Sequence, residues 1–176
     1  QRPLRSAPFS PYDVVGSTQV GDDFYFFTRD GTTLRSRDYV TWEALQLPLT
    51  DATPRSAASG DELVVLSSDD GTFFTSTDGQ NWAVSKLDGF NLLVRYSIQY
   101  NDGVYAVPYS LNGNTSIAFS KNGFEWFQSD AIGFGSTTDI VLGHSGLGLL
   151  MQSALYGDSL YRFSISRDSE VTFTNT

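Results

Sequence analysis

The seven residues STDGQNW, numbers 76–82, lie between two stretches of β-forming residues and recur in altered form elsewhere in the chain. SRDYVTW occupies residues 36–42, with Tyr39 at the position of the glycine. SKNGFEW occupies residues 120–126, with Asn122 at the position of the aspartate. The three tryptophans therefore fall at positions 42, 82 and 126, separated by 40 and 44 residues. This regular spacing shows that the motif is an internal repeat.

A spacing of this length is typical of one propeller blade made of four strands. A fourth copy is expected near the C-terminus, where Ser166 and Asp168 stand at the right offset and Phe173 lies one place later than the tryptophan would. An earlier turn signal before an apolar run also recurs, beginning at positions 21, 60, 101 and 144. The sequence therefore predicts an all-β fold, a β-propeller of about four blades that is complete or part of a larger assembly. The approximate blade boundaries are 13–50, 51–89, 90–131 and 132–176.

The predicted strands are best defined in the second unit, where turn residues separate short runs of β-forming residues. These strands are expected near residues 55–58, 62–67, 72–76 and 82–86, and the last unit is expected to have its own outer strand at 171–175. The distance between the two turn signals grows in the third and fourth units, in YSLNGNTS and SALYGDSLY. We expect this extra length to form longer loops on one rim.

The residue types of the motif suit the closing of a hairpin. A serine hydroxyl and an aspartate carboxylate can accept hydrogen bonds from main-chain N–H groups of the turn. Glycine supplies the positive φ that a tight reversal needs, and tryptophan packs a large ring against a neighbouring strand or blade. A structural role is therefore expected for Ser36, Asp38, Trp42, Ser76, Asp78, Gly79, Trp82, Ser120, Asn122, Gly123, Trp126, Ser166 and Asp168.

The pattern S-x-D-x-G-x-x-W resembles the Asp-box, or bacterial neuraminidase repeat, of sialidases, sortilin-type receptors, several glycoside hydrolases and many phage and secreted proteins. Only residues 76–82 match every position, and near copies cover the rest of the chain. The resemblance implies a propeller whose boxes lie on the rim away from the ligand face. It also implies a location outside a cell or on a virion surface.

The charge of the chain limits its partners. The net charge is −9, and the 11 Lys and Arg residues are scattered rather than clustered. Nucleic acids and anionic membranes are bound through basic patches, so neither is an expected partner. No apolar run approaches the length of a membrane span, so no membrane insertion is expected.

No cofactor or metal is expected. The chain has no cysteine, and its single histidine, His144, lies in a turn-like stretch without visible ligand partners. The acidic pair Asp69 and Asp70 is interpreted as a solvated turn, because the loop lacks the alternating oxygen ligands of a calcium site.

An enzyme of sialidase type is the alternative. Sialidases hold the substrate carboxylate with three arginines and use an aspartate and a tyrosine–glutamate pair, on six blades. The RPLR stretch at 2–5 does not match the start of those enzymes, and this chain has material for four blades. We therefore expect a non-catalytic module, with a fragment or degenerate relative of a sialidase-type glycosidase as the alternative.

Recognition is expected on the rim opposite the boxes, at the second-to-third-strand loops and the blade connections. Tyrosine with asparagine and aspartate can stack on and hydrogen-bond to a sugar or a protein. The candidate contact residues are Arg29, Tyr109, Asn112, Asn114, Tyr156, Asp158, Phe90 and Phe134. The expected partners are a protein or further copies of the chain, and a glycan as a further candidate.

The N-terminal segment 1–12, with three prolines and no alternating pattern, is expected to be an extended arm. Many propellers close their ring with an N-terminal strand that completes the last blade, but here no strand is expected to be exchanged in this way. The ring of four blades would have to close through contacts between blades alone, or the outer faces of the first and last blades would stay open. Open apolar faces are normally covered by another copy or another chain. We therefore expect the chain to work within an assembly, with the arm reaching to a neighbour.

Overall fold

The computed structural model describes most of the chain, including strands from every predicted unit. The described residues are 13–48, 52–60, 63–89, 97–111, 114–134, 136–144, 147–154, 157–166 and 170–175. The predicted N-terminal arm, residues 1–12, lies outside them.

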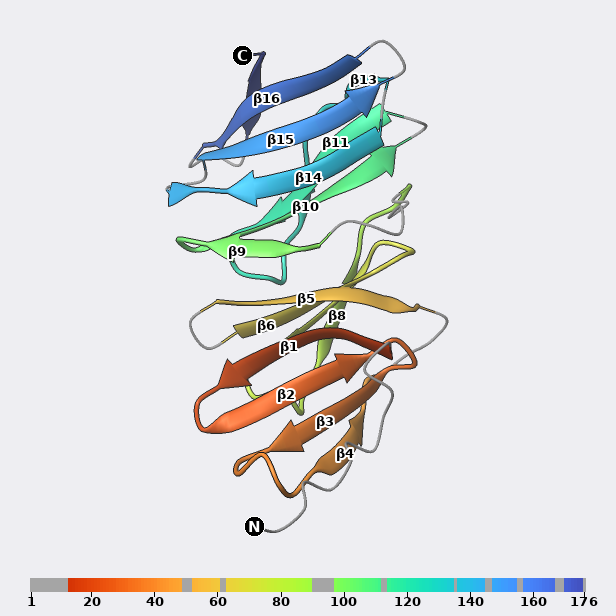
Figure 1. Cartoon of the computed structure of the whole chain (residues 1–176), viewed down its shortest axis with the longest axis vertical. Helices are drawn as coiled ribbons and strands as arrows, with labels where there is room; N and C mark the ends of the chain where they lie inside the picture. The colour runs from red at the N-terminus through yellow and green to blue at the C-terminus, as the bar shows by residue number, and fades with distance from the viewer. Residues whose placement is uncertain are drawn as a thin grey trace.

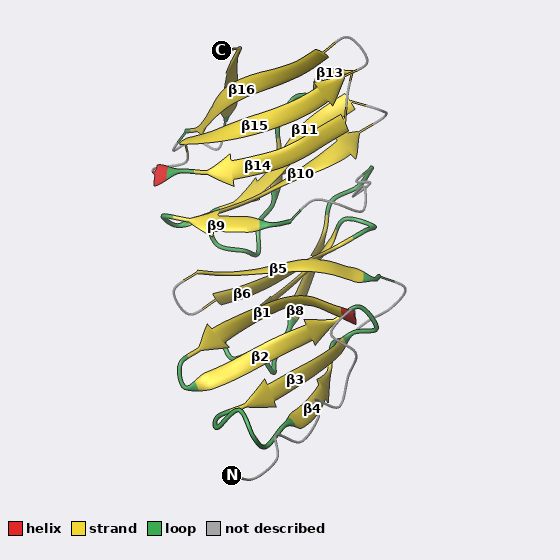
Figure 2. Cartoon of the chain, in the orientation of Figure 1, coloured by secondary structure: helices red, strands yellow, loops and turns green. Residues whose placement is uncertain are grey.

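The chain forms four antiparallel sheets, each built from consecutive strands (Figures 1 and 2). Unit 1 contains β1 (Val14–Val20), β2 (Asp23–Thr28), β3 (Thr32–Ser36) and β4 (Glu43–Gln46). Unit 2 contains β5 (Pro54–Gly60), β6 (Leu63–Ser68), β7 (Thr72–Ser76) and β8 (Ala83–Lys86). Unit 3 contains β9 (Gln99–Asn101), β10 (Val104–Leu111), β11 (Asn114–Ser120), β12 (Phe127–Gln128) and β13 (Ile132–Phe134). Unit 4 contains β14 (Ser136–Leu142), β15 (Leu147–Ala154), β16 (Gly157–Ile165) and β17 (Val171–Asn175).

The four units stack in chain order, with unit 1 and unit 4 at opposite ends of the molecule (Figure 1). The first strands of successive units lie near one another, since β1 contacts β5, β5 contacts β9, and β9 contacts β14. This arrangement, blades packed face to face with the first strand of each on the same side, is that of a partial β-propeller.

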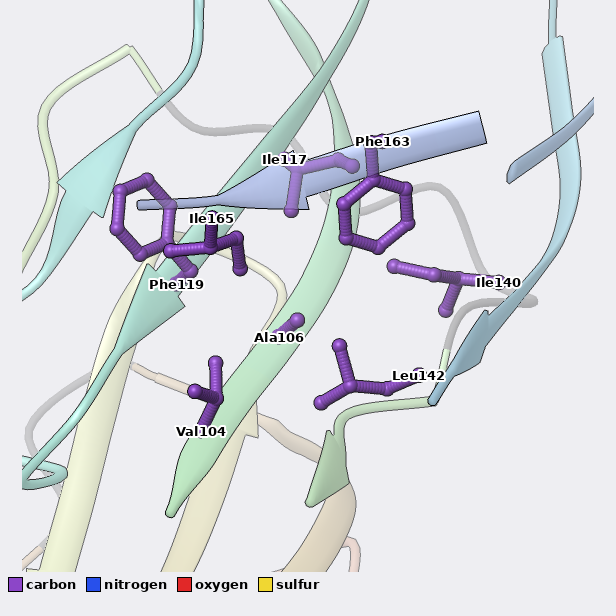
Figure 3. Packing of buried hydrophobic residues seen from close by; sticks show 8 residues of the cluster. All are labelled: Val104, Ala106, Ile117, Phe119, Ile140, Leu142, Phe163 and Ile165. Atoms are coloured by element: carbon purple, nitrogen blue, oxygen red, sulfur yellow. The ribbon is translucent and has the colours of Figure 1, made fainter. Parts of the chain in front are cut away.

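The hydrophobic core is divided into three layers, one between each pair of neighbouring units. Tyr25 and Phe27 of unit 1 pack against Phe74 of unit 2. Phe73, on the other face of the same strand, packs against Tyr105 and other residues of unit 3. The third layer lies between units 3 and 4, where side chains of β10, β11, β14 and β16 point toward one another (Figure 3). In units 2 and 3, successive residues of one strand therefore point into two different layers, which explains why β7 and β10 are apolar on both faces.

The prediction that units 3 and 4 have longer loops is wrong. The extra residues lengthen the strands instead: β10 and β11 have 8 and 7 residues, and β15 and β16 have 8 and 9. The hairpin of unit 3 stays paired as far as Leu111 and Asn114. Pro108 is tolerated within β10 because β9 pairs with that strand up to Ala106, so the missing N–H of Pro108 lies beyond the end of that ladder.

The boundary between the third and fourth units also differs from the expected one. The expected boundary after residue 131 would assign β13 to unit 4, but β13 pairs with β11 of unit 3. The ladder of unit 3 continues here because β12 is only two residues long, which leaves the far part of β11 available for pairing.

Candidate interaction surface

Three turns of closely similar geometry join the third and fourth strands of units 1, 2 and 3. We call them the outer turns; they are residues 36–42, 76–82 and 120–126. In the second, Asp78 Oδ1 accepts hydrogen bonds from the main-chain N–H groups of Gln80 and Asn81 at 2.8 and 2.7 Å. Ser76 Oγ accepts one from the N–H of Gly79 at 2.8 Å. The serine and the acid therefore satisfy donors that the sharp turn would otherwise leave unpaired.

The other two outer turns repeat this network with different residues. Asp38 Oδ1 accepts from the N–H groups of Val40 and Thr41 at 2.8 and 2.7 Å. Asn122 Oδ1 accepts from those of Phe124 and Glu125, both at 2.9 Å. An amide oxygen thus replaces a carboxylate oxygen without loss of the two bonds.

The backbone of the outer turns requires a positive φ at the glycine position. The φ values are 68° at Gly79 and 73° at Gly123, and Tyr39 adopts 58° at the same position of the first turn. Such a conformation is costly for a residue with a side chain. The Tyr39 ring lies on the Phe24 ring, with the ring centroids 4.0 Å apart, which helps to hold it there.

In the fourth unit the structure describes Ser166 but not Asp168. Ser166 Oγ accepts a hydrogen bond from the N–H of Glu170 at 3.1 Å. The Ser166 carbonyl accepts one from Lys121 Nζ of unit 3 at 2.8 Å. This turn is therefore tied to its neighbouring unit.

Hydrogen bonds lower the pKa of the turn carboxylates. The N–H groups of Thr41 and then Val40 hold the pKa of Asp38 at about 2. The N–H of Asn81 is the largest cause that keeps the pKa of Asp78 well below its usual range. Carboxylates that accept several N–H bonds are stabilised in the charged form, so both groups carry a negative charge at neutral pH.

The outer turns also connect neighbouring units. The Tyr25 hydroxyl of unit 1 donates to the carbonyl of Asp78 at 2.7 Å, and the Thr75 hydroxyl of unit 2 donates to that of Gly123 at 2.5 Å. The Trp82 ring meets Phe27 of unit 1 edge-on at 5.8 Å. Trp126 stacks on Phe73 of unit 2 with the ring centroids 3.7 Å apart.

Trp42 differs from the other two turn tryptophans, since it packs on Phe26 of its own unit at 5.2 Å. In units 2 and 3, by contrast, the tryptophan packs on the preceding unit. No other described unit lies beyond unit 1 at this end of the stack (Figure 1).

Two of the hollows beside the outer turns lie between neighbouring units. The first, of about 370 Å³, lies between units 1 and 2 and is lined by charged groups that include Arg35, Arg37 and Asp78. Both arginines bind Asp23, with N–O distances of 3.0 Å from Arg35 and 2.7 Å from Arg37. Arg37 and then Arg35 lower the pKa of Asp23, so this hollow holds a compact cluster of paired charges.

The second hollow, of about 320 Å³, lies between units 2 and 3, and we call it the Phe124 hollow. It is lined by Thr75, Thr77, Asn81 and Trp82 of unit 2 and by Phe124 of unit 3. Phe124 is 45% exposed. Tyr39 and Val40 of the first outer turn are exposed as well, at 58% and 65%. We call the surface formed by the three outer turns and the two hollows the outer-turn face.

The structure corrects one residue of the predicted binding rim. Tyr109 is only 1% exposed, because it lies in the layer between units 2 and 3, where its hydroxyl donates to Gln128 Oε1 at 2.7 Å. Burial raises the pKa of this hydroxyl. Tyr109 is therefore a core residue, since the lengthened strand β10 carries it into the sheet.

The other rim residues are only partly described. Arg29 is exposed in the turn between β2 and β3, and Asn114 is partly buried at the start of β11, paired with Leu111. Phe134 lies at the end of β13 and Asp158 in β16, but their side chains are outside the described part. Phe90, Asn112 and Tyr156 lie outside the described residues. The structure thus brings no group of these residues together within its described part.

Sequence reasoning missed a second repeated turn. Thr28 and Ser68 each donate a hydroxyl hydrogen bond to an aspartate two residues later, Asp30 and Asp70, at 2.6 and 2.7 Å. Burial acts to raise the pKa of Asp70, but hydrogen bonds from Ser68, Thr72 and Lys86 outweigh it and hold the pKa at about 2. The signal was present as TRDGT at 28–32 and SDDGT at 68–72.

Neither a metal cluster nor a membrane helix is found in the described part of the chain. There, no group of three or more His, Asp or Glu side chains is placed to hold a metal ion. No helix among these residues is long and apolar enough to cross a membrane.

Comparison with known proteins identifies the fold. No protein-family model matches the chain, and no curated protein does. Among solved structures, YCF48 from Cyanidioschyzon merolae is 14% identical, with a TM-score of 0.64 over 90% of this chain and 57% of that chain. A catalytically inactive virginiamycin B lyase from Staphylococcus aureus, solved with quinupristin, is 15% identical, with a TM-score of 0.67 over 97% of this chain and 58% of the lyase chain.

The computationally designed protein Ika4 is 14% identical, with a TM-score of 0.61 over 94% of this chain and 99% of its own. The chain thus spans little more than half the length of the YCF48 and lyase chains but nearly the whole designed chain. At these identities the likeness shows the β-propeller fold alone.

Proposed function

We propose that the chain is a non-catalytic protein-interaction module, an Asp-box β-propeller that recognises a partner protein through its outer-turn face and not through the opposite rim that the Asp-box resemblance implied. One observation carries this proposal: apolar side chains are exposed on the outer turns, where Tyr39, Val40 and Phe124 are 45% to 65% exposed. Large apolar side chains that are exposed on turns held by hydrogen bonds favour protein contact.

The acidic residues support a role without catalysis. Asp38 and Asp78 use their carboxylate oxygens to hold the turns, and Glu43 and Glu125 are exposed. Among the described residues, Arg35 and Arg37 form an arginine pair, but both bind Asp23, so they are not arranged to receive a substrate carboxylate. A sialidase-type glycosidase remains the alternative enzyme, and hydrolysis of a fluorogenic sialoside by the chain would overturn the non-catalytic proposal.

The solved propellers support protein partners in part. YCF48, whose architecture this chain shares over about half of that chain's length, has been solved with a bound peptide.

We infer a location outside a cell or on a virion surface, which rests on the resemblance of the outer turns to Asp-boxes. Glycan recognition is a second candidate, favoured by the Phe124 hollow.

Selection of displayed peptides on the full immobilised chain tests the proposed function. Peptides that bind the wild type are then measured against Val40→Ser, Phe124→Ser and a control, Leu160→Ser, whose side chain is 40% exposed on unit 4. We expect at least one turn variant to weaken binding about tenfold, a loss of about 1.4 kcal/mol, while the control leaves it unchanged. Equal affinity for all four proteins would contradict the outer-turn face as the binding surface.

A further inference from the structure

We propose that the Phe124 hollow binds a neutral carbohydrate, with one sugar ring against the Phe124 side chain. This proposal rests on the outer-turn face being a recognition surface. It assigns a ligand class to outer-turn residues for which the sequence pattern predicted only a structural role in closing the turn.

The Phe124 ring is exposed but its backbone is fixed. The preceding carbonyl, that of Gly123, accepts a hydrogen bond from the buried Thr75 hydroxyl of unit 2 at 2.5 Å. The N–H of Phe124 itself donates to Asn122 Oδ1 at 2.9 Å. The turn that carries the ring is therefore held beside unit 2, whose residues line the same hollow, so little backbone entropy is lost when a ligand binds.

The polar groups of the hollow are also oriented. The Asn81 amide nitrogen donates to Asp78 Oδ2 at 2.7 Å, which leaves the amide oxygen as an acceptor with a defined direction. Thr77 is exposed beside it and adds a hydroxyl group that can both donate and accept. An aromatic surface flanked by a few fixed polar groups is the usual composition of a small-ligand pocket.

A sugar ring matches this composition on both sides. Its C–H groups carry a slight positive charge and can lie on the electron-rich face of Phe124. Its hydroxyl groups can donate to Asn81 and exchange hydrogen bonds with Thr77. The volume of about 320 Å³ is at the lower end of the range for small-ligand pockets, about 300–1,000 Å³, which suits one or two sugar units.

The charges select a neutral sugar. The described residues that line the hollow include no Lys, Arg, Asp or Glu. An acidic sugar such as sialic acid is normally held by a cation that pairs with its carboxylate. The hollow between units 1 and 2 does contain two arginines, but Asp23 already binds both. A neutral hexose is therefore the class that fits the Phe124 hollow.

Saturation-transfer NMR on the full chain tests the proposal, with lactose and methyl hexosides as neutral probes and sialyllactose as the acidic probe. The test variant is Phe124→Ala and the matched control is Phe127→Ala, another phenylalanine of unit 3, exposed by 42% against 45% and not lining the hollow. We expect transfer to at least one neutral probe with the wild type and Phe127→Ala, and loss of that transfer with Phe124→Ala. The tryptophan fluorescence of the chain is expected to change with the same sugar, because Trp82 lines the hollow.

Three outcomes would overturn the proposal: no transfer to any neutral sugar at millimolar concentration, equal transfer with both variants, or binding of sialyllactose alone. Peptides that depend on Phe124 without any sugar binding would assign the hollow to an apolar side chain of a protein. That result would leave the proposed function intact. Sugar binding without any selected peptide would instead support the carbohydrate site and count against the protein-interaction proposal.

Discussion

The hydroxyl of Tyr25 donates a 2.7 Å hydrogen bond to the main-chain carbonyl of Asp78, 53 residues further along the chain. The ring of Tyr25 also lies directly against Gly79, where an added Cβ would come within 2.4 Å of it. Tyr25 of unit 1 thus contacts the second outer turn through both its hydroxyl and its ring. The contact couples a local turn motif to the packing between blades.

Tyr25→Phe is expected to lower the free energy of unfolding by about 1 kcal/mol, because it removes this hydrogen bond and keeps the ring. Urea unfolding measures the change. Tyr39→Phe is the control, since the Tyr39 side chain is 58% exposed and its change should stay within about 0.5 kcal/mol. Equal effects of the two substitutions would show that the Tyr25 bond does not contribute.

Gly79→Ala is expected to cost more than Tyr25→Phe. The φ of 68° penalises a side chain by about 1–2 kcal/mol, and the contact with the Tyr25 ring adds a further cost of similar size. Gly21→Ala separates the two effects, because Gly21 has a φ of 58° but nothing within 4 Å of an added Cβ. A melting temperature lowered equally by both substitutions would argue that strain alone acts at Gly79.

Trp82→Ala is expected to destabilise the chain by about 3–5 kcal/mol, since it removes a large ring from the layer between units 1 and 2. Asp78→Ala is expected to cost about 1–2 kcal/mol through lost turn hydrogen bonds. Thermal and urea unfolding both check this order. A larger effect of Asp78→Ala would mean that turn closure, rather than the packing of the ring, dominates the stability of the blade.

Gly60→Ala tests the packing of the first strands. An added Cβ would lie 2.1 Å from the Tyr100 ring, so β5 approaches unit 3 closely at this point. We expect a loss of about 1–3 kcal/mol, as for other overpacked sites. The double variant with Tyr100→Ala should show a smaller additional cost of the Gly60 change. Additive costs would contradict a direct contact.

Local turn chemistry could be predicted from the sequence because the residues of a turn contact one another. In unit 2 the expected strand at 72–76 agrees with β7, and the expected outer strand at 171–175 agrees with β17. The side chain of Tyr109 could not be placed, because polar neighbours in YSLNGNTS indicated a loop where the hairpin in fact continues. Whether a hairpin ends or lengthens depends on the neighbouring sheets, and this information is absent from a local pattern.

The Phe124 hollow could not be predicted for a similar reason. Most of its lining residues come from two outer turns 44 residues apart, which belong to different units linked by the bond from Thr75 to Gly123. Each residue taken alone is an ordinary turn or strand residue. The repeat pattern indicated which residues close each turn, but not which ones project over the neighbouring unit.

The acids of the outer turns are expected to make the stability depend on pH below about 4. Asp78 has a pKa well below its usual range in the folded chain, whereas in the unfolded chain it should return to about 3.9. A carboxyl group with a lowered folded pKa contributes stability that is fully present above the unfolded value and is lost as the pH falls through the folded value. Asp38 and Asp70, with pKa values of about 2, act in the same direction.

The third outer turn supplies the matched comparison, because Asn122 accepts the same two N–H bonds without a charge. Asp78→Asn should therefore keep the turn and make the loss of stability between about pH 4 and pH 2 shallower than in the wild type. Asn122→Asp should make it steeper, since it adds a carboxylate held by the N–H groups of Phe124 and Glu125. Urea unfolding of the three proteins across this pH range measures the slopes. The remaining acids are common to all three, so identical slopes would mean that the turn carboxylates are not stabilised in the charged form.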